Sequence, residues 1–582
     1  MGASKIEPRM SDGVVSYGRA TANKSLKQWF PAGILSLILG LGLAVLSEPW
    51  VVAQQATAQL AGSVKDQSGA VVVGAKVTLK NSQTNGTHNA TTGKDGDYLF
   101  NLIPIGTYEL TVEQAGFDTY VRKGITLEIN QNAKLDVALR VGKSTQVVEV
   151  TGDLTQVDTV TATLGKVETT QRILELPLVE RDTMQLGLLQ AGVFAPDQDD
   201  GSGNPFSVSG QRSESMTFLI DGADNNDFVG NNIVVNPNPD AVAEFKIITN
   251  NYTAEYGRTS GGIVNQVIKS GTNAIHGSAF EFFRNTALDA SDYFLKEVPV
   301  LRRNLYGGTI GFPIIKDKMF FFASYQGTQR SEGQNPGPIQ VLSPTERTGD
   351  FSDLLSGASP LQLYDPTTGN AYFNNQVPVD PVIANYIDKY LPSPNRAGNT
   401  FVAAPVASIK DNQFIFRYDY NISTKDVLSA VYLFDDTPDE YPFQVVNGAS
   451  SGGNVPVGSG FTDNNRFQNA AITWTRTFTP TMLNELRFAT NRVATYDAVP
   501  TTTTPPSALG FLTVTPDDPK GTAPPLMSVT GNFNLGPSPQ GPTKVHDTTF
   551  QYQDTFSWTH GRHDLKFGAD LRWVENLSLI HI

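Results

Sequence analysis

The sequence predicts a mainly β chain with three successive parts: a small β-sandwich, a segment of mixed α/β pattern, and the strands of an antiparallel transmembrane β-barrel. Glycine (52 residues), phenylalanine (32) and tyrosine (19) are abundant, and only 17% of the residues are charged. This composition suits β structure with many turns and a lipid-facing aromatic surface. Short alternating apolar runs are separated by turn residues, which indicates strands rather than helices. Composition by itself also fits an array of soluble β-sandwiches. The order of strands, turns and loops is therefore needed to distinguish such an array from a membrane barrel.

The first 53 residues have the pattern of a secretory signal peptide. Lys24 and Lys27 precede an apolar run, Ala32–Ser47, which is shorter than the ~20 residues that a spanning helix needs. Small-residue cleavage sites follow this run near Ala53. An uncleaved anchor helix is the alternative. No later apolar run reaches spanning length, so we expect an exported chain that enters a membrane only through strands.

Composition and motifs exclude several classes of function. The net charge of −14 argues against nucleic acid as a partner. The absence of cysteine excludes a disulfide scaffold, a thiolate zinc site and a cysteine nucleophile. His560 and His563 lack the glutamate and the spacing of a zinc hydrolase motif. There is also no nucleophile elbow, so we predict no enzyme, no cofactor and no metal site.

Residues 59–141 are predicted to form the β-sandwich. Its expected strands are Gln59–Lys65, Ala75–Lys80, Tyr98–Leu102, Gly106–Gln114 and Leu135–Val141. The order of core and turn residues in this part resembles the carboxypeptidase regulatory-like domain. That resemblance implies a transthyretin-like sandwich, grouped with the carbohydrate-binding-like folds. It rests on Gly62, Val64, Asp66, Gly69, Gly74, Ala75, Val77, Thr92, Asp95, Gly96, Tyr98, Phe100, Gly106, Tyr108, Leu110, Val112, Gly116 and Phe117.

Residues 161–276 form the segment of mixed α/β pattern. Two short helices are expected, Thr169–Leu176, which Pro177 ends, and Arg181–Leu189. An apolar strand, Met216–Ile220, then runs into the turn Asp221-Gly222, in which Asx side-chain bonds are expected. The family resemblance given below implies a hairpin here, with the residues Gly210, Gln211, Arg212, Asp221 and Gly222.

From Gly277 to the end, residues 277–582 show the pattern of a β-barrel. Phe414 and Phe416 alternate with Gln413 and Ile415, so that one face is aromatic and the other largely polar. A soluble sandwich gives the same alternation, but short turns alternating with long polar loops at 328–411, 436–464 and 496–546 favour a membrane barrel. The expected strands lie near 277–284, 304–312, 319–327, 412–421, 426–435, 466–478, 482–494, 548–558 and 563–574.

These strands are too few for a closed barrel around a separate domain, which needs about 22. The pattern therefore predicts that the sequence is a fragment that stops in mid-barrel. Alternation is expected to end after Trp573, and the tail Asn576–Ile582 does not continue it cleanly.

The stretch between the two architectures carries the most specific resemblance. AEYGRTSGGIVNQVIKSGTNAIHGSAFEFFRN is similar to the junction between plug and barrel in TonB-dependent outer-membrane receptors, in particular the Oar-like group. The resemblance implies that residues 161–276 are a plug domain and that its backbone passes closely against the barrel wall. Glu244 and Arg258 are the charged candidates for pairing between plug and wall. The junction residues are Glu244, Tyr256, Gly257, Arg258, Gly261, Gly262 and Gly271.

The linker 142–160 contains one extended segment, Val147-Val148-Glu149-Val150-Thr151. An exposed strand ahead of a plug suits β-augmentation by a periplasmic partner. In place and character the segment resembles the TonB box of these receptors. An ordinary linker strand, or the last strand of the sandwich, is the equally supported alternative.

The resemblance implies a receptor in the outer membrane of a Gram-negative-type bacterium, in contact with outer-membrane lipid. A TonB-type periplasmic protein would energise uptake of a large ligand of the siderophore, oligosaccharide or peptide class, bound by the plug and the long loops. The long loop Gln334–Asp411 has aromatic side chains that suit ligand stacking or loop packing, namely Tyr364, Tyr372, Phe373, Tyr386 and Tyr390. A surface adhesion or assembly barrel that presents its sandwich without transport is the alternative function.

Overall fold

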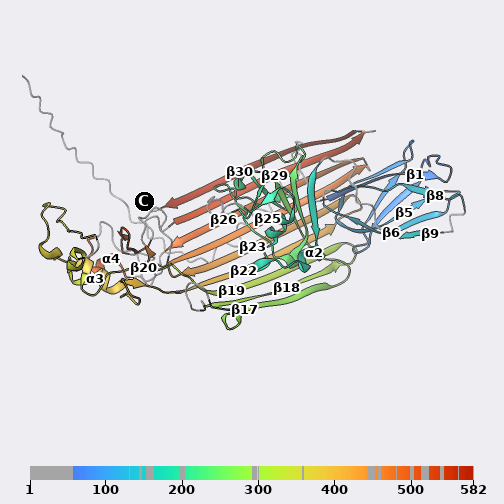
Figure 1. The fold of residues 1–582 in the computed structure, drawn as a ribbon. Helices are drawn as coiled ribbons and strands as arrows, with labels where there is room; N and C mark the ends of the chain where they lie inside the picture. The colour runs from blue at the N-terminus through green and yellow to red at the C-terminus, as the bar shows by residue number, and fades with distance from the viewer. Residues whose placement is uncertain are drawn as a thin grey trace, which may run out of the picture. The chain divides into compact units, whose positions relative to one another are not determined.

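The computed structural model describes residues 57–129, 131–142, 147–151, 163–195, 204–291, 298, 300–356, 359–443, 453–455, 460–479, 481–498, 504–512, 524–537, 543–560 and 563–580 (Figure 1). The predicted signal peptide over residues 1–53 lies outside these residues, as does most of the 142–160 linker. Within the described ranges, none of the helices has both the length and the apolar character needed to cross a membrane.

Two small sheets form the sandwich. In the first, β1 pairs with β4, β7 and β8, and in the second the order is β3-β2-β5-β6-β9. The strands are β1 Thr57–Asp66, β2 Lys76–Asn81, β3 Thr87–Thr91, β4 Asp97–Pro104, β5 Gly106–Glu113, β6 Thr119–Leu127, β7 Asn132–Lys134, β8 Val137–Leu139 and β9 Val147–Thr151.

The sandwich core contains the residues that the alternating pattern predicts. Val64, Val77, Leu110 and Tyr108 are buried in one apolar cluster, and burial of such side chains is the main driving force for the fold. The strands β3 and β6 were not predicted, because their sequences THNAT and TYVRKGITL lack clean alternation. The segment expected as a single strand near Leu135 is instead two short strands, both parallel to β1.

A mixed sheet in the order β10-β15-β16-β13-β14 forms the centre of the plug segment. Its apolar cluster includes Ile173, Phe218 and Phe245, which pack the first helix against the sheet. The elements are β10 Leu164–Thr169, α2 Thr170–Glu175, the 3₁₀ turns Val179–Arg181, Thr183–Leu189, Ser213–Ser215 and Pro239–Ala241, β11 Val193–Phe194, β12 Ser207–Val208, β13 Thr217–Ile220, β14 Ala223–Asp224, β15 Val242–Asn250 and β16 Ile263–Ile268.

The prediction of an α-helix over Arg181–Leu189 is wrong, because Thr183–Leu189 form a 3₁₀ helix. Glu180 and Arg181 have φ values of 56° and 60°, which interrupts a right-handed helix. The Asp182 side chain then accepts a hydrogen bond from the Met184 backbone N–H at 2.8 Å and caps a 3₁₀ helix.

Nine long antiparallel strands lie side by side in one sheet of the described chain (Figure 1). They coincide with the nine predicted strands but extend further at most ends. Their order is β17-β18-β19-β22-β23-β25-β26-β29-β30, and β17 and β30 each have one unpaired edge among the described residues. The strands are β17 His276–Asn285, β18 Leu301–Ile315, β19 Met319–Gly333, β22 Val406–Asn421, β23 Asp426–Tyr441, β25 Phe461–Thr479, β26 Met482–Ala498, β29 Thr543–His560 and β30 His563–Ile580.

The expected end of the last strand after Trp573 is wrong, because β30 pairs with β29 as far as Thr543↔Ile580. Strands pair through backbone hydrogen bonds, which do not require alternating apolar side chains. The irregular side-chain pattern after Trp573 therefore did not reveal that the strand continues.

The two faces of the barrel sheet differ as predicted. Phe414 and Phe416 are exposed, whereas Gln413 and Ile415 are buried. The buried face packs against the plug in a cluster that joins Ile220, Val234, Val235, Ala241 and Ile268 of the plug to Phe322, Ile415, Leu433 and Ala471 of the barrel. The exposed aromatic face is therefore the face that the sequence pattern predicts to contact lipid.

The long loops are shorter than predicted, and three of them fold together. A cluster that includes Ile339, Tyr386, Val455, Leu509 and Phe533 draws on all three loops. The Tyr386 hydroxyl donates to the Pro525 carbonyl at 3.1 Å. The elements are β20 Ile339–Gln340, 3₁₀ turns Thr286–Leu288, Glu346–Thr348, Ser352–Leu355 and Phe373–Asn375, α3 Pro381–Tyr390, β21 Thr400–Phe401, β24 Gly453–Asn454, α4 Pro506–Leu509, β27 Met527–Val529 and β28 Phe533–Leu535.

The loop aromatics divide between packing and exposure. Tyr386 and Tyr390 are buried in the three-loop cluster, so their role is structural. Tyr364 and Phe373 are exposed, at 59% and 84% of their surface. Sequence patterns do not separate these cases, since each depends on contacts between distant loops.

Candidate functional site

The hairpin of β13 and β14 is held by buried polar contacts with the barrel strands. Ile220 pairs with Ala223 across a two-residue turn, and the turn residues Asp221 and Gly222 have φ values of 48° and 78°. Positive φ at both central positions is the requirement of a type I′ turn, and Asp-Gly satisfies it. Parallel pairing of β13 with β16 ties the hairpin to the plug sheet.

Arg487 of β26 lies directly over this turn. Its Nη1 donates to the Gly222 carbonyl at 2.8 Å and to Gln553 Oε1 at 3.0 Å. Its Nη2 lies 3.0 Å from Glu485 Oε1, and both side chains of this ion pair are 0% exposed. A Cβ on Gly222 would lie 2.9 Å from Arg487 Nη1. Gly222 thus supplies both the turn conformation and the space for the guanidinium.

Arg417 of β22 holds the other turn residue. Its Nη1 donates to Asp221 Oδ1 at 3.0 Å and to the Ile268 carbonyl at 2.9 Å, and both acceptors belong to the plug. The carboxylate of Asp419, two residues along the same strand, accepts hydrogen bonds from Arg417 Nε at 2.9 Å and from Arg417 Nη2 at 3.1 Å. This two-point contact orients the guanidinium.

A third arginine, Arg572 of β30, binds the end of the hairpin. Its Nη1 lies 2.9 Å from Asp224 Oδ2, and its Nη2 lies 2.8 Å from Asp570 Oδ2. Arg258 also approaches Asp224, at 3.5 Å, but its side chain is 51% exposed. Arg258 therefore pairs within the plug, which corrects the expected direct contact with the wall.

The two hairpin carboxylates lie in a poorly solvated site. Burial raises the pKa of Asp221 and of Asp224, while Arg417 and Arg572 act in the opposite direction. A buried charge that loses its partner is strongly destabilising, so separating Asp221 from Arg417, or Asp224 from Arg572, costs free energy. The hairpin arginines are defined as Arg417, Arg487 and Arg572.

Amide side chains of the wall complete the contact with the backbone of the hairpin. The Asp224 N–H donates to Gln551 Oε1 at 3.0 Å, and its carbonyl accepts from Asn469 Nδ2 at 2.9 Å and Asn491 Nδ2 at 3.2 Å. Hydrogen bonds of this kind satisfy buried backbone groups that no plug strand reaches. Polar side chains of the barrel strands therefore hold the turn and the end of the hairpin.

The junction glycines do not share one role. A Cβ on Gly271 would lie 2.4 Å from the Phe321 carbonyl oxygen, so this residue does pass closely against the barrel strands. Gly261 and Gly262 are crowded by Ser215 and Val208 of the plug itself, and Gly257 faces open space. The predicted approach to the wall is therefore wrong for these three. Tyr256 packs against the plug cluster of Leu219, Ile248 and Ile263.

Glu244 contacts the sandwich segment and not the barrel wall. Its Oε2 accepts from the Ile129 N–H at 2.7 Å, and Lys246 Nζ donates to the Ile129 carbonyl at 2.8 Å. The predicted plug–wall pairing of Glu244 is wrong because its strand presents this side chain to Ile129. Burial raises the pKa of Glu244 to about 8, with Glu128 adding to the shift and the Ile129 N–H opposing it.

We expect the Glu244 contact to weaken in alkali. A carboxyl group whose pKa is raised on folding stabilises the folded state below its ordinary pKa, near 4.5, and this stabilisation is lost as pH rises through about 8. Hydrogen exchange at the Ile129 amide should accelerate between pH 6 and pH 9 relative to Glu244→Gln, which keeps an acceptor but does not ionise. Equal acceleration in both proteins would contradict the assignment.

The segment Val147–Thr151 is strand β9. It pairs in parallel with β6, from Thr119↔Val147 to Lys123↔Thr151, and is the edge strand of the second sandwich sheet. This agrees with the alternative that it is the last strand of the sandwich. Its second edge pairs with no strand in the described part of the chain, so the backbone remains suitable for strand addition.

The remaining hairpin residues lie apart from the turn. Gly210 has a φ of 75°, and Gln211 and Arg212 are exposed in the connection from β12 to β13. The sequence interpretation identified Asp221 and Gly222 but missed the hairpin arginines. A signal was present: arginine recurs on the polar face of strands with few charges, as in the runs FRYDY, LRF and LRW.

Comparison with known families agrees with this architecture. Residues 267–579, more than half of the chain, match the family described as outer membrane beta barrel domain. Residues 59–140 match the carboxypeptidase regulatory-like domain. Among solved structures, the outer membrane transporter YddB from Escherichia coli has 10% identity and a TM-score of 0.43 over 69% of this chain and 47% of that chain. The siderophore receptor PirA from Acinetobacter baumannii has 13% identity and a TM-score of 0.39 over the same shares.

A curated relative adds sequence evidence. The TonB-dependent transporter Oar of Myxococcus xanthus is 30% identical over 311 residues, which cover 51% of this chain. The chain spans 28% of the length of that protein. The predicted resemblance to Oar-like TonB-dependent receptors and the mainly β fold class are confirmed. The chain belongs to the outer-membrane β-barrel family, has an N-terminal carboxypeptidase regulatory-like domain, and is similar over half of its length to an Oar-type TonB-dependent transporter.

Proposed function

We propose that this protein takes up a large external ligand across the outer membrane, driven by a TonB-type periplasmic protein. The observation that carries the proposal is the set of hairpin arginines, which hold an Asp-Gly turn of the plug against the polar face of the barrel sheet. Paired, buried charges hold the plug hairpin against the barrel strands. The hairpin can leave the strands only when mechanical work separates these pairs. Residues 1–53 would direct export.

The periplasmic partner would act on β9. This strand offers an open edge, and its neighbour β6 leads along the chain to Ile129, whose backbone is held by Glu244 and Lys246 of the plug strand β15. Force applied at β9 would therefore reach the sheet that carries the hairpin. The ligand belongs to the siderophore, oligosaccharide or peptide class, and we place its binding at the plug and the loop cluster.

The test replaces Val148 and Val150 by proline in cells that carry the full-length protein. Proline removes backbone N–H donors and blocks strand addition. Energised uptake of the ligand should be lost while binding at the cell surface is retained. Thr151→Ser is the control, because it keeps the backbone donors and should transport normally.

Unchanged uptake in the proline variant would remove β9 from the mechanism. If the ligand binds at the surface of wild-type cells but does not enter even when the inner membrane is energised, the protein is an adhesion barrel and the transport proposal fails.

A further inference from the structure

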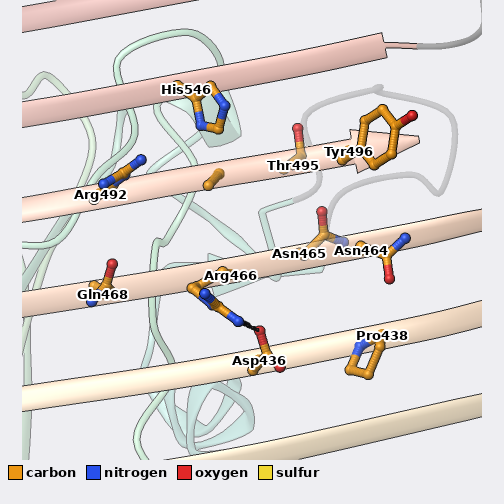
Figure 2. A pocket seen from close by; sticks show the side chains of 11 residues that line it. Asp436, Pro438, Asn464, Asn465, Arg466, Gln468, Arg492, Thr495, Tyr496 and His546 are labelled. Carbon is orange, nitrogen blue, oxygen red and sulfur yellow. Dashed lines mark hydrogen bonds and ion pairs between the residues drawn. The ribbon is translucent and has the colours of Figure 1, made fainter. Parts of the chain in front are cut away.

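The lipid-facing wall carries a polar cavity above its aromatic band. The cavity has a volume of about 380 Å³ and spans four neighbouring strands, β23, β25, β26 and β29 (Figure 2). It is lined by Asp436, Pro438, Asn464, Asn465, Arg466, Gln468, Arg492, Ala494, Thr495, Tyr496 and His546. Most of these residues occupy even positions of the strands, and the odd positions Asn469, Arg487 and Asn491 contact the plug. The cavity therefore opens on the outer face of the sheet, away from the plug.

Strand register places three basic side chains around one small residue. Arg466 and His546 are the cross-strand partners of Ala494 on its two sides, and Arg492 lies two residues away on the same strand. Neighbouring strands are about 4.8 Å apart, and diagonal neighbours about 7–8 Å. Because alanine has a short side chain, the centre of this triangle is open. We call this group the outer basic triad.

The triad has free hydrogen-bonding capacity. Arg466 Nε and Nη2 each lie 2.9 Å from Asp436 Oδ1. A dashed line marks this contact in Figure 2. Arg492 is exposed and has no ion pair among the described residues. Nδ1 of His546 is buried and has no hydrogen-bond partner there. The nearby carboxylates on this face are Asp436 and, on the next strand, Glu575, whose partner is Thr548.

A second ion pair on the same two strands allows the position of the triad along the membrane normal to be estimated. Arg476 lies 3.4 Å from Asp426, beside a short turn, and Asp426 is ten residues before Asp436 on β23. At about 3.4 Å per residue and a tilt near 40°, this spacing is roughly 26 Å, close to the ~25 Å apolar band of an outer-membrane barrel. The aromatics Tyr432, Phe550 and Trp573 lie in the row just below the triad. Long loops follow beyond it, so the triad lies at the headgroup level of the external leaflet.

We propose that the outer basic triad binds the phosphate-bearing headgroup of an outer-leaflet lipid. Arginine presents paired donors that match phosphate oxygens, and two arginines with a histidine around an open centre suit one phosphate group. The acyl chains of the lipid would lie along the aromatic rows below. The site would fix the rotational and vertical position of the barrel in its membrane. It does not depend on the transport proposal.

The experiment measures binding to the purified full-length protein in non-ionic detergent by calorimetry. The probes are dihexanoyl phosphatidic acid, dihexanoylglycerol, which lacks only the phosphate, and inorganic phosphate. We expect phosphatidic acid to bind at least tenfold more tightly than either of the others. Arg466→Gln combined with Arg492→Gln, and separately Ala494→Leu, which fills the centre but keeps every charge, should each weaken this binding at least tenfold.

Arg476→Gln is the matched control, since Arg476 lies on the same strand and face as Arg466 and has an equivalent aspartate partner. Its affinity for phosphatidic acid should equal that of the wild type. Equal affinity in the wild type and the Ala494→Leu variant would overturn the site. Tight binding of inorganic phosphate would overturn the lipid assignment in favour of a free anion, and tight binding of dihexanoylglycerol would show that the chains alone are recognised.

Discussion

Replacing Arg487 by methionine is expected to destabilise the plug by about 3–5 kcal/mol, because removal of one partner leaves a buried charge uncompensated. Glu485, 0% exposed, would lose its ion-pair partner, and the Gly222 carbonyl would lose its donor. Hydrogen exchange at the amides of residues 217–224 measures the free energy of opening. In cells, the same variant should admit large antibiotics that the wild-type protein excludes.

A double variant separates the charge from the packing. When Glu485→Met accompanies Arg487→Met, no unpaired charge remains, and replacing a buried pair by apolar residues is often close to neutral. We therefore expect most of the lost stability to return. A single Arg487→Met protein with wild-type exchange would show that the hairpin is held by its amide contacts alone.

Gly222→Ala is expected to destabilise the hairpin by about 2–3 kcal/mol. A residue with a Cβ is strained by about 1–2 kcal/mol at the φ of 78° that Gly222 adopts. The new methyl group would also lie 2.9 Å from Arg487 Nη1 and force the guanidinium away from the carbonyl. The shift in the denaturation midpoint of the plug, together with exchange at residues 217–224, reports the combined loss.

Gly210→Ala is the matched control for backbone strain. Gly210 has a similar φ of 75°, but nothing lies within 4 Å of its added Cβ, so its cost should be only about 1 kcal/mol. In the Arg487→Met background, the cost of Gly222→Ala should fall to that of Gly210→Ala, because the two residues then no longer touch. Equal costs at both glycines in the wild-type background would refute the steric contact.

The sequence interpretation succeeded where a local pattern reports a local structure. Alternation placed all nine barrel strands, since side-chain direction alternates along any strand regardless of its partners. The Asp221-Gly222 turn was identified because few residues adopt positive φ at two successive positions. The second helix failed because Glu180 and Arg181 adopt positive φ values that their residue types do not signal.

At the candidate site, too, local sequence patterns did not reveal contacts between residues that are distant in the chain. Arg258 and Glu244 were chosen as wall contacts because they are charged and close to the junction. The structure instead assigns that role to Arg417, Arg487 and Arg572, whose distance in sequence from the hairpin hides the pairing. Long-range contacts of this kind are set by strand register, where a shift of one residue reverses which side chains face the plug.

By itself, the sequence determined the fold class, the order of sandwich, plug and barrel, the polar and aromatic faces of the wall, and the Asp-Gly turn. The plug was implied by the family resemblance of the junction stretch, and the other features follow from periodicity, composition and backbone preference, which act over a few residues. Only the tertiary structure decided which arginines hold the plug, that Glu244 contacts Ile129, and that Arg466, Arg492 and His546 surround Ala494. Each of these contacts joins residues from separate strands, and their distances depend on how the strands pair.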